Sequence, residues 1–271
     1  MWTTIALTMT LSAMPGQSGE LTLSNIRPTH GLLGSERPDS RLLPGDIYFV
    51  TFDIDGLKVD SKSGTMFYTM AMEVRGKDKK GSDTIVYKSE PQDLDAPVPL
   101  GGQSLPGFAH VDLGRDMPPG DYTLKVTVTD KATRVSKSFE KKFEVLRPTF
   151  GLIQLKMSYD KDGQMPAPHI GVAGQAFWVN FNAVNFERAG NPKNPDIKFE
   201  MFVLDERGKP TLDIPIGGSI DDLPREFSYA PTQFFLPLNR SGKFTVKLKA
   251  TDNIGKKTAE LSIPITVYDS K

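Results

Sequence analysis

The sequence contains an internal repeat, in which four stretches recur in the same order. The four pairs are IRPTHG (26–31) with LRPTFG (146–151), GDIYFVTF (45–52) with GQAFWVNF (174–181), VPLGG (98–102) with IPIGG (214–218), and GDYTLKVTVTD (120–130) with GKFTVKLKATD (242–252). Their offsets are 120, 129, 116 and 122 residues, and this small drift indicates one fold repeated with loops of different length. Two long copies indicate tandem domains, because the repeats of a solenoid are shorter and more numerous. We therefore expect one domain at residues 21–146 and a second at 147–271.

The last matched pair alternates between apolar and polar residues. The apolar set is Tyr122, Leu124, Val126 and Val128 in the first copy and Phe244, Val246, Leu248 and Ala250 in the second. A period of two is that of a strand with one buried face, whereas in a helix the same residues would encircle the axis. Both stretches are therefore predicted to be strands that pack one face on a core.

The pair that begins at 45 and 174 defines a second core strand. Tyr48, Val50 and Phe52 match apolar residues in the second copy, so this set is expected to face the core. Phe49 and Trp178 then fall at matching positions on the outer face. They are our candidate partner-binding residues, because exposed aromatic patches mark interaction sites, and Trp178 would also suit stacking on a sugar ring. The alternative is that the Pro-rich loops 91–106 and 187–196 cover both side chains.

A third predicted strand, residues 65–74, carries a methionine-rich stripe. The stripe consists of Met66, Tyr68, Met70, Met72 and Val74. Methionine fills irregular gaps in hydrophobic cores, so we expect the stripe to be core filler rather than a ligand surface.

The final third of each repeat, with PGDYTLKVTVTD (119–130) as its most typical stretch, resembles bacterial immunoglobulin-like and PKD-like modules. The resemblance implies an all-β fold of two tandem immunoglobulin-like antiparallel β-sandwich domains related by the internal repeat. It implies a structural role for Tyr122, whose counterpart Phe244 lacks the hydroxyl. It also implies adhesion, spacing or binding outside the cytoplasm. The W-x-F-G-D-G motif of true PKD domains is absent from the sequence.

The start of the sequence indicates export. Residues 1–19 carry no charged side chain, and residues 2–14 are mildly apolar with small residues at Ser12 and Ala13. This pattern fits the apolar region and small-residue exit of a signal peptide, although no basic residue precedes the run. We expect residues 1–20 to be a signal peptide, or otherwise a disordered or docked segment. Location is accordingly expected to be secreted, periplasmic or at the cell envelope.

The charge balance bears on the class of partner. Lys and Arg total 33, as do Asp and Glu, whereas nucleic-acid binding normally needs a strongly basic face. No stretch reaches the roughly 20 strongly apolar residues that a transmembrane helix needs. We therefore expect neither nucleic-acid binding nor an integral membrane protein.

Catalytic signatures are missing from the sequence. It has no cysteine, no G-x-S-x-G, and no P-loop. The three histidines, His30, His110 and His169, are far apart along the chain, and the repeat matches His30 with Phe150. The chain is expected not to be an enzyme and to hold no cofactor, with calcium as the one candidate ion.

Two acidic turns are the candidate calcium sites. Asp53 and Asp55 lie in DIDG (53–56), and Asp160 and Asp162 lie in DKDG (160–163). Calcium favours carboxylate oxygens at such spacing, although neither segment supplies the remaining ligands of an EF-hand. The alternative is a hairpin turn in which Asp bonds its own backbone and Gly takes a positive φ.

These observations predict an exported, non-catalytic structural or protein-interaction module at the bacterial cell envelope, with an envelope protein or polysaccharide as partner. One alternative is a carbohydrate-binding accessory protein that uses outward aromatic residues. A second is a hydrolase with a site between the domains.

Overall fold

The computed structural model describes residues 19–77, 81–190 and 194–270, and within these ranges the chain is all-β with no helix. The predicted signal segment 1–20 lies outside the described residues except for Gly19 and Glu20. No described segment forms a helix that is long and apolar enough to cross a membrane.

The first ten strands form the N-terminal unit, and the next eight form the C-terminal unit. The N-terminal strands are β1 (Thr22–Thr29), β2 (Arg41–Leu42), β3 (Ile47–Asp55), β4 (Val59–Asp60), β5 (Thr65–Lys77), β6 (Asp83–Lys88), β7 (Gln92–Pro97), β8 (Ser104–Asp112), β9 (Gly120–Asp130) and β10 (Ser136–Val145). The C-terminal strands are β11 (Gly151–Ser158), β12 (Ile170–Val172), β13 (Ala176–Val184), β14 (Ile197–Leu204), β15 (Ile216–Ile220), β16 (Tyr229–Pro237), β17 (Gly242–Asp252) and β18 (Lys257–Tyr268).

Each unit contains two sheets whose strands follow the same order. In the N-terminal unit the sheets are β1-β3-β8 and β2-β10-β9-β5-β4, with β6 and β7 also paired to β5. In the C-terminal unit they are β11-β13-β16 and β12-β18-β17-β14-β15. The sheets are antiparallel as predicted, except that β2 and β12 run parallel to β10 and β18. In each unit the chain passes from its first strand, β1 or β11, to the other sheet. There its second strand, β2 or β12, pairs in parallel with the last strand of the unit, β10 or β18.

The inward faces predicted from the alternation are confirmed. Tyr48, Val50 and Phe52 are buried on β3, and they pack against apolar residues of β9 and β10. Their counterparts on β13 belong to a separate apolar cluster that β17 and β18 complete. Phe52 and Phe139, one from each sheet, meet edge to face with ring centroids 4.9 Å apart. The two sheets of each unit are thus held together by side chains at every second position.

Tyr122 has a structural contact that its counterpart lacks. Its buried hydroxyl donates a hydrogen bond to the carbonyl oxygen of Pro118 at 2.8 Å. Phe244 has no hydroxyl, and the guanidinium of Arg240 lies 5.1 Å from the centre of its ring.

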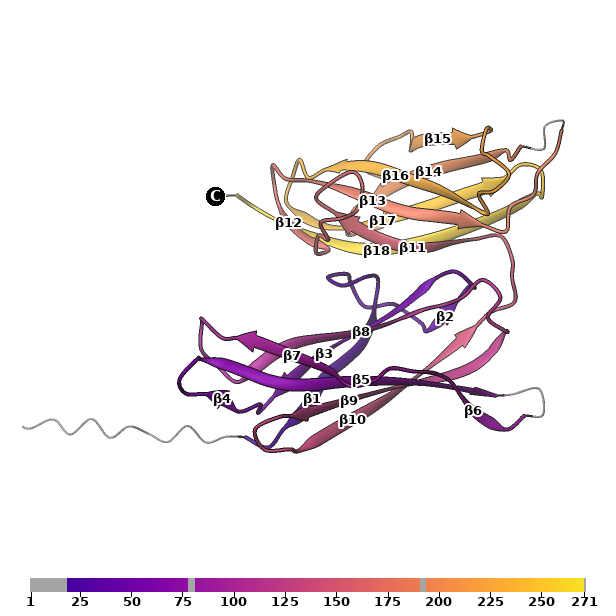
Figure 1. Cartoon of the computed structure of the whole chain (residues 1–271). Coiled ribbons are helices and arrows are strands. Elements are labelled where there is room, and N and C mark those ends of the chain that lie inside the picture. The colour runs from indigo at the N-terminus through magenta and orange to yellow at the C-terminus, as the bar shows by residue number, and fades with distance from the viewer. Residues whose placement is uncertain (1–18, 78–80, 191–193, 271) are drawn as a thin grey trace, which may run out of the picture.

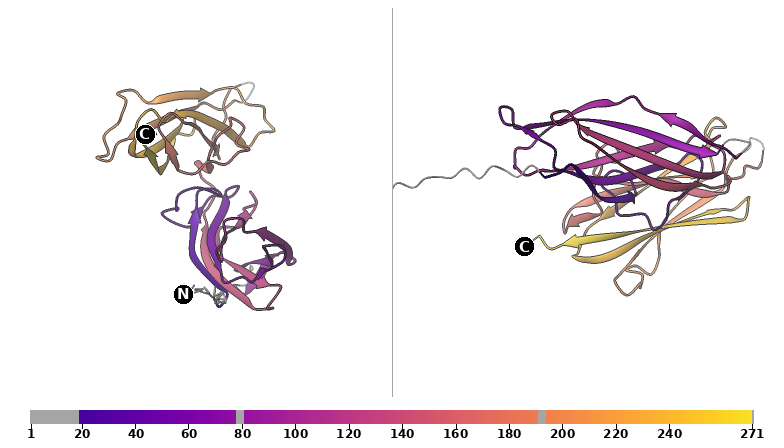
Figure 2. Two further views of the ribbon diagram at one scale, coloured as in Figure 1. Left: turned by 90° about the vertical axis from the view of Figure 1, so that its left-hand side faces the viewer. Right: turned by 90° about the horizontal axis from the view of Figure 1, so that it is seen from below.

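The two units lie one above the other and meet along a narrow region (Figures 1 and 2). Gln154 of β11 donates to the Asp46 carboxylate through its backbone N–H and to the carbonyl oxygen of Gly45 through its side chain, both at 2.8 Å. Leu43, Ile153 and Val184 form a small apolar cluster beside these bonds. We call this contact region the joint.

Candidate functional site

The methionine stripe of β5 is core at its ends and open in its middle. Met66 and Val74 are fully buried, whereas Tyr68, Met70 and Met72 are partly exposed. These three side chains line a cavity of about 840 Å³ between the two sheets, which we call the groove. The three central side chains also pack against the buried core, so the prediction of core filler is confirmed for the stripe but misses that its centre lines the groove as well.

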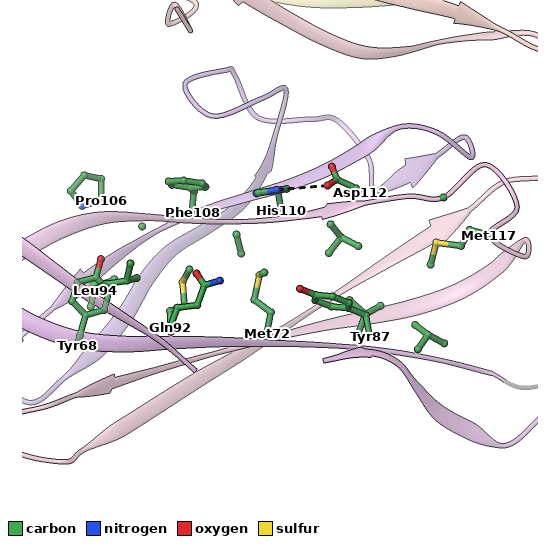
Figure 3. A pocket seen from close by; sticks show the side chains of 18 of the residues that line it. Tyr68, Met72, Tyr87, Gln92, Leu94, Pro106, Phe108, His110, Asp112 and Met117 are labelled. Carbon is green, nitrogen blue, oxygen red and sulfur yellow. Dashed lines mark ion pairs between the residues drawn. The ribbon is translucent and has the colours of Figure 1, made fainter. Parts of the chain in front are cut away.

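Strands from both sheets form the walls of the groove (Figure 3). Tyr68, Met72 and Tyr87 extend from β5 and β6 toward β8, and Gln92 and Leu94 extend from β7. Burial, and secondarily the negative charge of Asp95, raises the pKa of the Tyr68 hydroxyl. Tyr68 is therefore neutral at physiological pH, and the lining is mainly apolar.

A missing ring explains why the groove is open. Ala109 of β8 lies opposite Val50, whereas at the matching position of the C-terminal unit Phe234 of β16 lies opposite Val179. The Phe234 ring is buried, with its centre 6.0 Å from that of Phe181. The N-terminal unit thus has a methyl group where the C-terminal unit has a phenyl ring.

The strand facing this position differs in burial accordingly. Met72 pairs with Val126, and the matching pair in the C-terminal unit is Met201 with Leu248. Met201 is 1% exposed, in contrast to the partly exposed Met72. The same fold therefore carries a closed core in one unit and an apolar groove in the other.

Phe49, a predicted partner-binding residue, lies at the joint instead of under loop 91–106. Its ring stacks on His110 with centroids 5.4 Å apart, and both line a second cavity of about 340 Å³. The loop His30–Gly34 and residues of β11 complete this joint cavity. Part of the loop expected to cover Phe49 is β7, which pairs with β5 in the other sheet.

Trp178 lies half-buried on the outer face of β13, away from Phe49. Phe235 of β16 pairs with it, and their ring centroids are 5.1 Å apart. Phe235 is 49% exposed, so the two rings form an aromatic platform that a ligand can reach. Trp178 stays a predicted partner-binding residue, and the sequence analysis missed its neighbour Phe235, whose stretch resembles nothing in the first copy.

The joint also buries two histidines. His169 Nδ1 lies 2.8 Å from the hydroxyl oxygen of Ser35, which belongs to the other unit. Burial lowers the pKa of His169 to about 4, and burial together with the charges of Arg37 and His169 lowers the pKa of His30 to about 3. Both rings are therefore neutral at physiological pH.

Among the described residues, Asp46 is the only acidic residue that lines the joint cavity. Its carboxylate accepts hydrogen bonds from Arg37, from the backbone of Ile47 and from the backbone of Gln154. A carboxylate with these contacts holds the joint together.

The two predicted calcium turns do not bring their carboxylates together into a larger cluster. Asp53 accepts a hydrogen bond from Asn25, and Asp55 accepts one from Ser24. Asp160 accepts backbone hydrogen bonds from Gln164 and Met165, which lower its pKa. Asp162 lies in the same turn, and its backbone oxygen accepts from the side chain of Gln164. Across the described ranges, no group of three or more His, Cys, Asp or Glu residues is placed to hold a metal ion. Both segments stay candidate calcium sites.

No protein-family model and no curated protein matches the chain. Among solved structures, it is similar to the C-terminal domain of the antigen I/II-family protein AspA of Streptococcus pyogenes (10% identity, 91% of this chain and 99% of that chain, TM-score 0.32). The C-terminal domain of the AgI/II polypeptide BspA of Streptococcus agalactiae is similar at 9% identity, with 90% of this chain and 100% of that chain covered and a TM-score of 0.31.

A third similar structure is the DNA glycosylase AlkC of Pseudomonas fluorescens bound to DNA. The match has 12% identity and a TM-score of 0.30, and it covers 47% of this chain but only 31% of the glycosylase. TM-scores this low do not establish a shared fold, so the function has to be argued from the groove, the platform and the joint.

Proposed function

We propose that the chain is an exported, non-catalytic protein-interaction module of the bacterial cell envelope, built from two tandem immunoglobulin-like β-sandwich domains. The domains correspond to residues 21–146 and 147–271. Export rests on the uncharged, mildly apolar residues 1–19.

The groove is the observation that carries this proposal. An apolar cavity of about 840 Å³ is a suitable site for apolar side chains of a partner. Its aromatic and methionine lining has the composition of adaptable binding surfaces. The C-terminal unit supports a binding role for the groove, because the same strand order there fills the matching space with the Phe234 ring.

The aromatic platform supports a second candidate function, carbohydrate binding. Trp178 and Phe235 lie side by side with their ring planes inclined by 54°, and Phe235 is 49% exposed while Trp178 is partly exposed, so a sugar ring could stack on one of them. The two functions use different units, so single substitutions separate them.

The test is capture of proteins from a cell-envelope extract beside binding to a glycan array. Met72→Asp places a charge in the groove and is expected to abolish protein capture. Ala71→Asp is the matched control, because Ala71 follows the β5 alternation onto the opposite face. Trp178→Ala is expected to leave protein capture unchanged.

Protein capture that survives Met72→Asp, with circular dichroism equal to that of the wild type, would refute the groove as the site. Glycan binding that Trp178→Ala removes would favour the carbohydrate function instead.

A further inference from the structure

The groove lies beside a free sheet edge. β8 is the last strand of its sheet, and among the described residues it pairs with β3 alone. One side of β8 therefore presents backbone donors and acceptors without a neighbouring strand. Edges of this kind accept an added strand from another chain.

The hydrogen-bond pattern identifies which groups point outward. Gly56 donates to the carbonyl oxygen of Gln103, and Leu113 donates to the carbonyl oxygen of Asp46, so both bonds are to odd-numbered residues of this segment. Because antiparallel pairing alternates along a strand, the even-numbered residues direct their backbone groups away from β3. Phe108, His110 and Asp112 thus offer N–H and C=O groups at the free edge.

The groove matches the side chains of a strand placed at this edge. Ala109 and Val111 point inward from β8, and both line the groove. A strand beside β8 would direct every second side chain into the same space, toward Met70 and Met72. Pro106 has no N–H and shortens the usable edge at its other end.

Charge at the groove mouth indicates which segment fits. The lining includes Asp112 and Asp116 but no Lys or Arg among the described residues. The Asp112 side chain is 74% exposed, with its carboxylate 4.0 Å from His110 Nε2. Positive charge at one end of a docked strand would complement this mouth.

We propose that the groove takes an extended segment of a partner protein, with apolar residues at alternate positions and Lys or Arg at one end. The segment adds to the free edge of β8 through backbone hydrogen bonds at Phe108, His110 and Asp112. Its apolar side chains enter the groove, and its basic end lies at Asp112 and Asp116. This inference rests on the proposed function and names the chemistry of its partner.

The probe is a synthetic peptide in which leucine and threonine alternate, with lysines at one end. We expect its addition to shift the backbone amide signals of Phe108, His110 and Asp112 in nuclear magnetic resonance spectra and to slow their hydrogen exchange. Ala109→Phe introduces the residue found at Phe234 and is expected to weaken binding at least tenfold. Changing both Asp112 and Asp116 to Asn should weaken it by about two- to fivefold, and less at high salt.

Two control peptides test strand addition. A peptide with the same composition but a helical period should not bind, and methylation of the backbone nitrogens that face β8 should abolish binding. Binding that survives this methylation would overturn strand addition and leave the groove as the interaction site. Failure of all peptides, while Met72→Asp still abolishes capture from extracts, would overturn the stated chemistry of the partner but not the proposed function.

Two other occupants would also overturn the inference. Dimerisation that Ala109→Phe prevents would identify a second copy of the chain as the occupant. Slow exchange of the three amides in the free chain, lost on removal of residues 1–18, would identify that segment instead.

Discussion

The two units use the same strand order and differ in how they fill one space. In the C-terminal unit Phe234 and Met201 are both buried in one closed core cluster. In the N-terminal unit Ala109 leaves the gap open, and Met72 is partly exposed. The N-terminal unit therefore tolerates an unfilled edge, because the remaining inward residues of β3, β9 and β10 supply the core. The comparison distinguishes the residues that stabilise the fold from the residues that line the groove.

The largest effect is expected from truncating the two methionines at matching positions, Met72 and Met201. Met201→Ala should lower the free energy of unfolding by about 2–5 kcal/mol, because it leaves a cavity in a closed core. Met72→Ala should cost less, about 1 kcal/mol, because its side chain is only partly buried and one side of it lines the groove. Native-state hydrogen exchange at Leu124 and Leu248 measures the two units separately.

Equal losses for both methionines would contradict the comparison, since they would mean that the groove is packed in solution. Met66→Ala is a useful control, because Met66 is fully buried on the same strand as Met72 and does not line the groove. It should behave like Met201→Ala.

The second effect is a loss of folding stability at acidic pH. His30 is buried with its pKa lowered to about 3, and the repeat places Phe150, also buried, at the matching position. The unfolded histidine binds a proton below about pH 6.5, whereas the folded one does not, so stability is lost as the pH falls from there toward 3. Each such histidine contributes a slope of up to about 1.4 kcal/mol per pH unit.

His30→Phe should remove the contribution of His30 to the pH dependence of stability and leave that of His169. The measurement is the free energy of urea unfolding at several values between pH 6.5 and 4.5, above the range where most carboxylates titrate. An unchanged slope would mean that His30 is hydrated and charged in the native state.

The sequence predicts well where one element determines its own faces. Tyr48, Val50 and Phe52 were predictable as core because the alternation and the second copy agree. The groove was not predictable, because exposure of Met72 depends on which residue lies across from it on β8. Ala109 and Phe234 belong to stretches without recognisable similarity, so the repeat could not align them. Phe49 was misplaced for a related reason, since the other unit forms part of its surroundings.

The third effect concerns the Tyr122 hydroxyl, which has no counterpart at the matching residue Phe244. Tyr122→Phe removes the bond to Pro118 and makes the position like that of Phe244. We expect a loss of about 0.5–1.5 kcal/mol, the usual net contribution of one hydrogen bond. The reverse change, Phe244→Tyr, should give no comparable gain, because Arg240 lies over that ring. Thermal unfolding of both variants measures the two changes in stability. A gain for Phe244→Tyr equal to the loss for Tyr122→Phe would show that the two positions are equivalent.

The smallest effect is expected at the candidate calcium residues, which lie at the end of β3 in the N-terminal unit and in a turn after β11 in the C-terminal unit. The Asp160 carboxylate already accepts two backbone N–H groups, and Asp53 and Asp55 each accept a side-chain donor. A calcium ion would have to replace these bonds and recruit further oxygens, since the ion takes six to eight ligands. Titration with calcium at millimolar concentration should therefore leave the melting temperature unchanged. A rise that Asp160→Asn abolishes would restore the turn at 160–163 as a calcium site, and one that only Asp53→Asn abolishes would place the ion in the N-terminal unit.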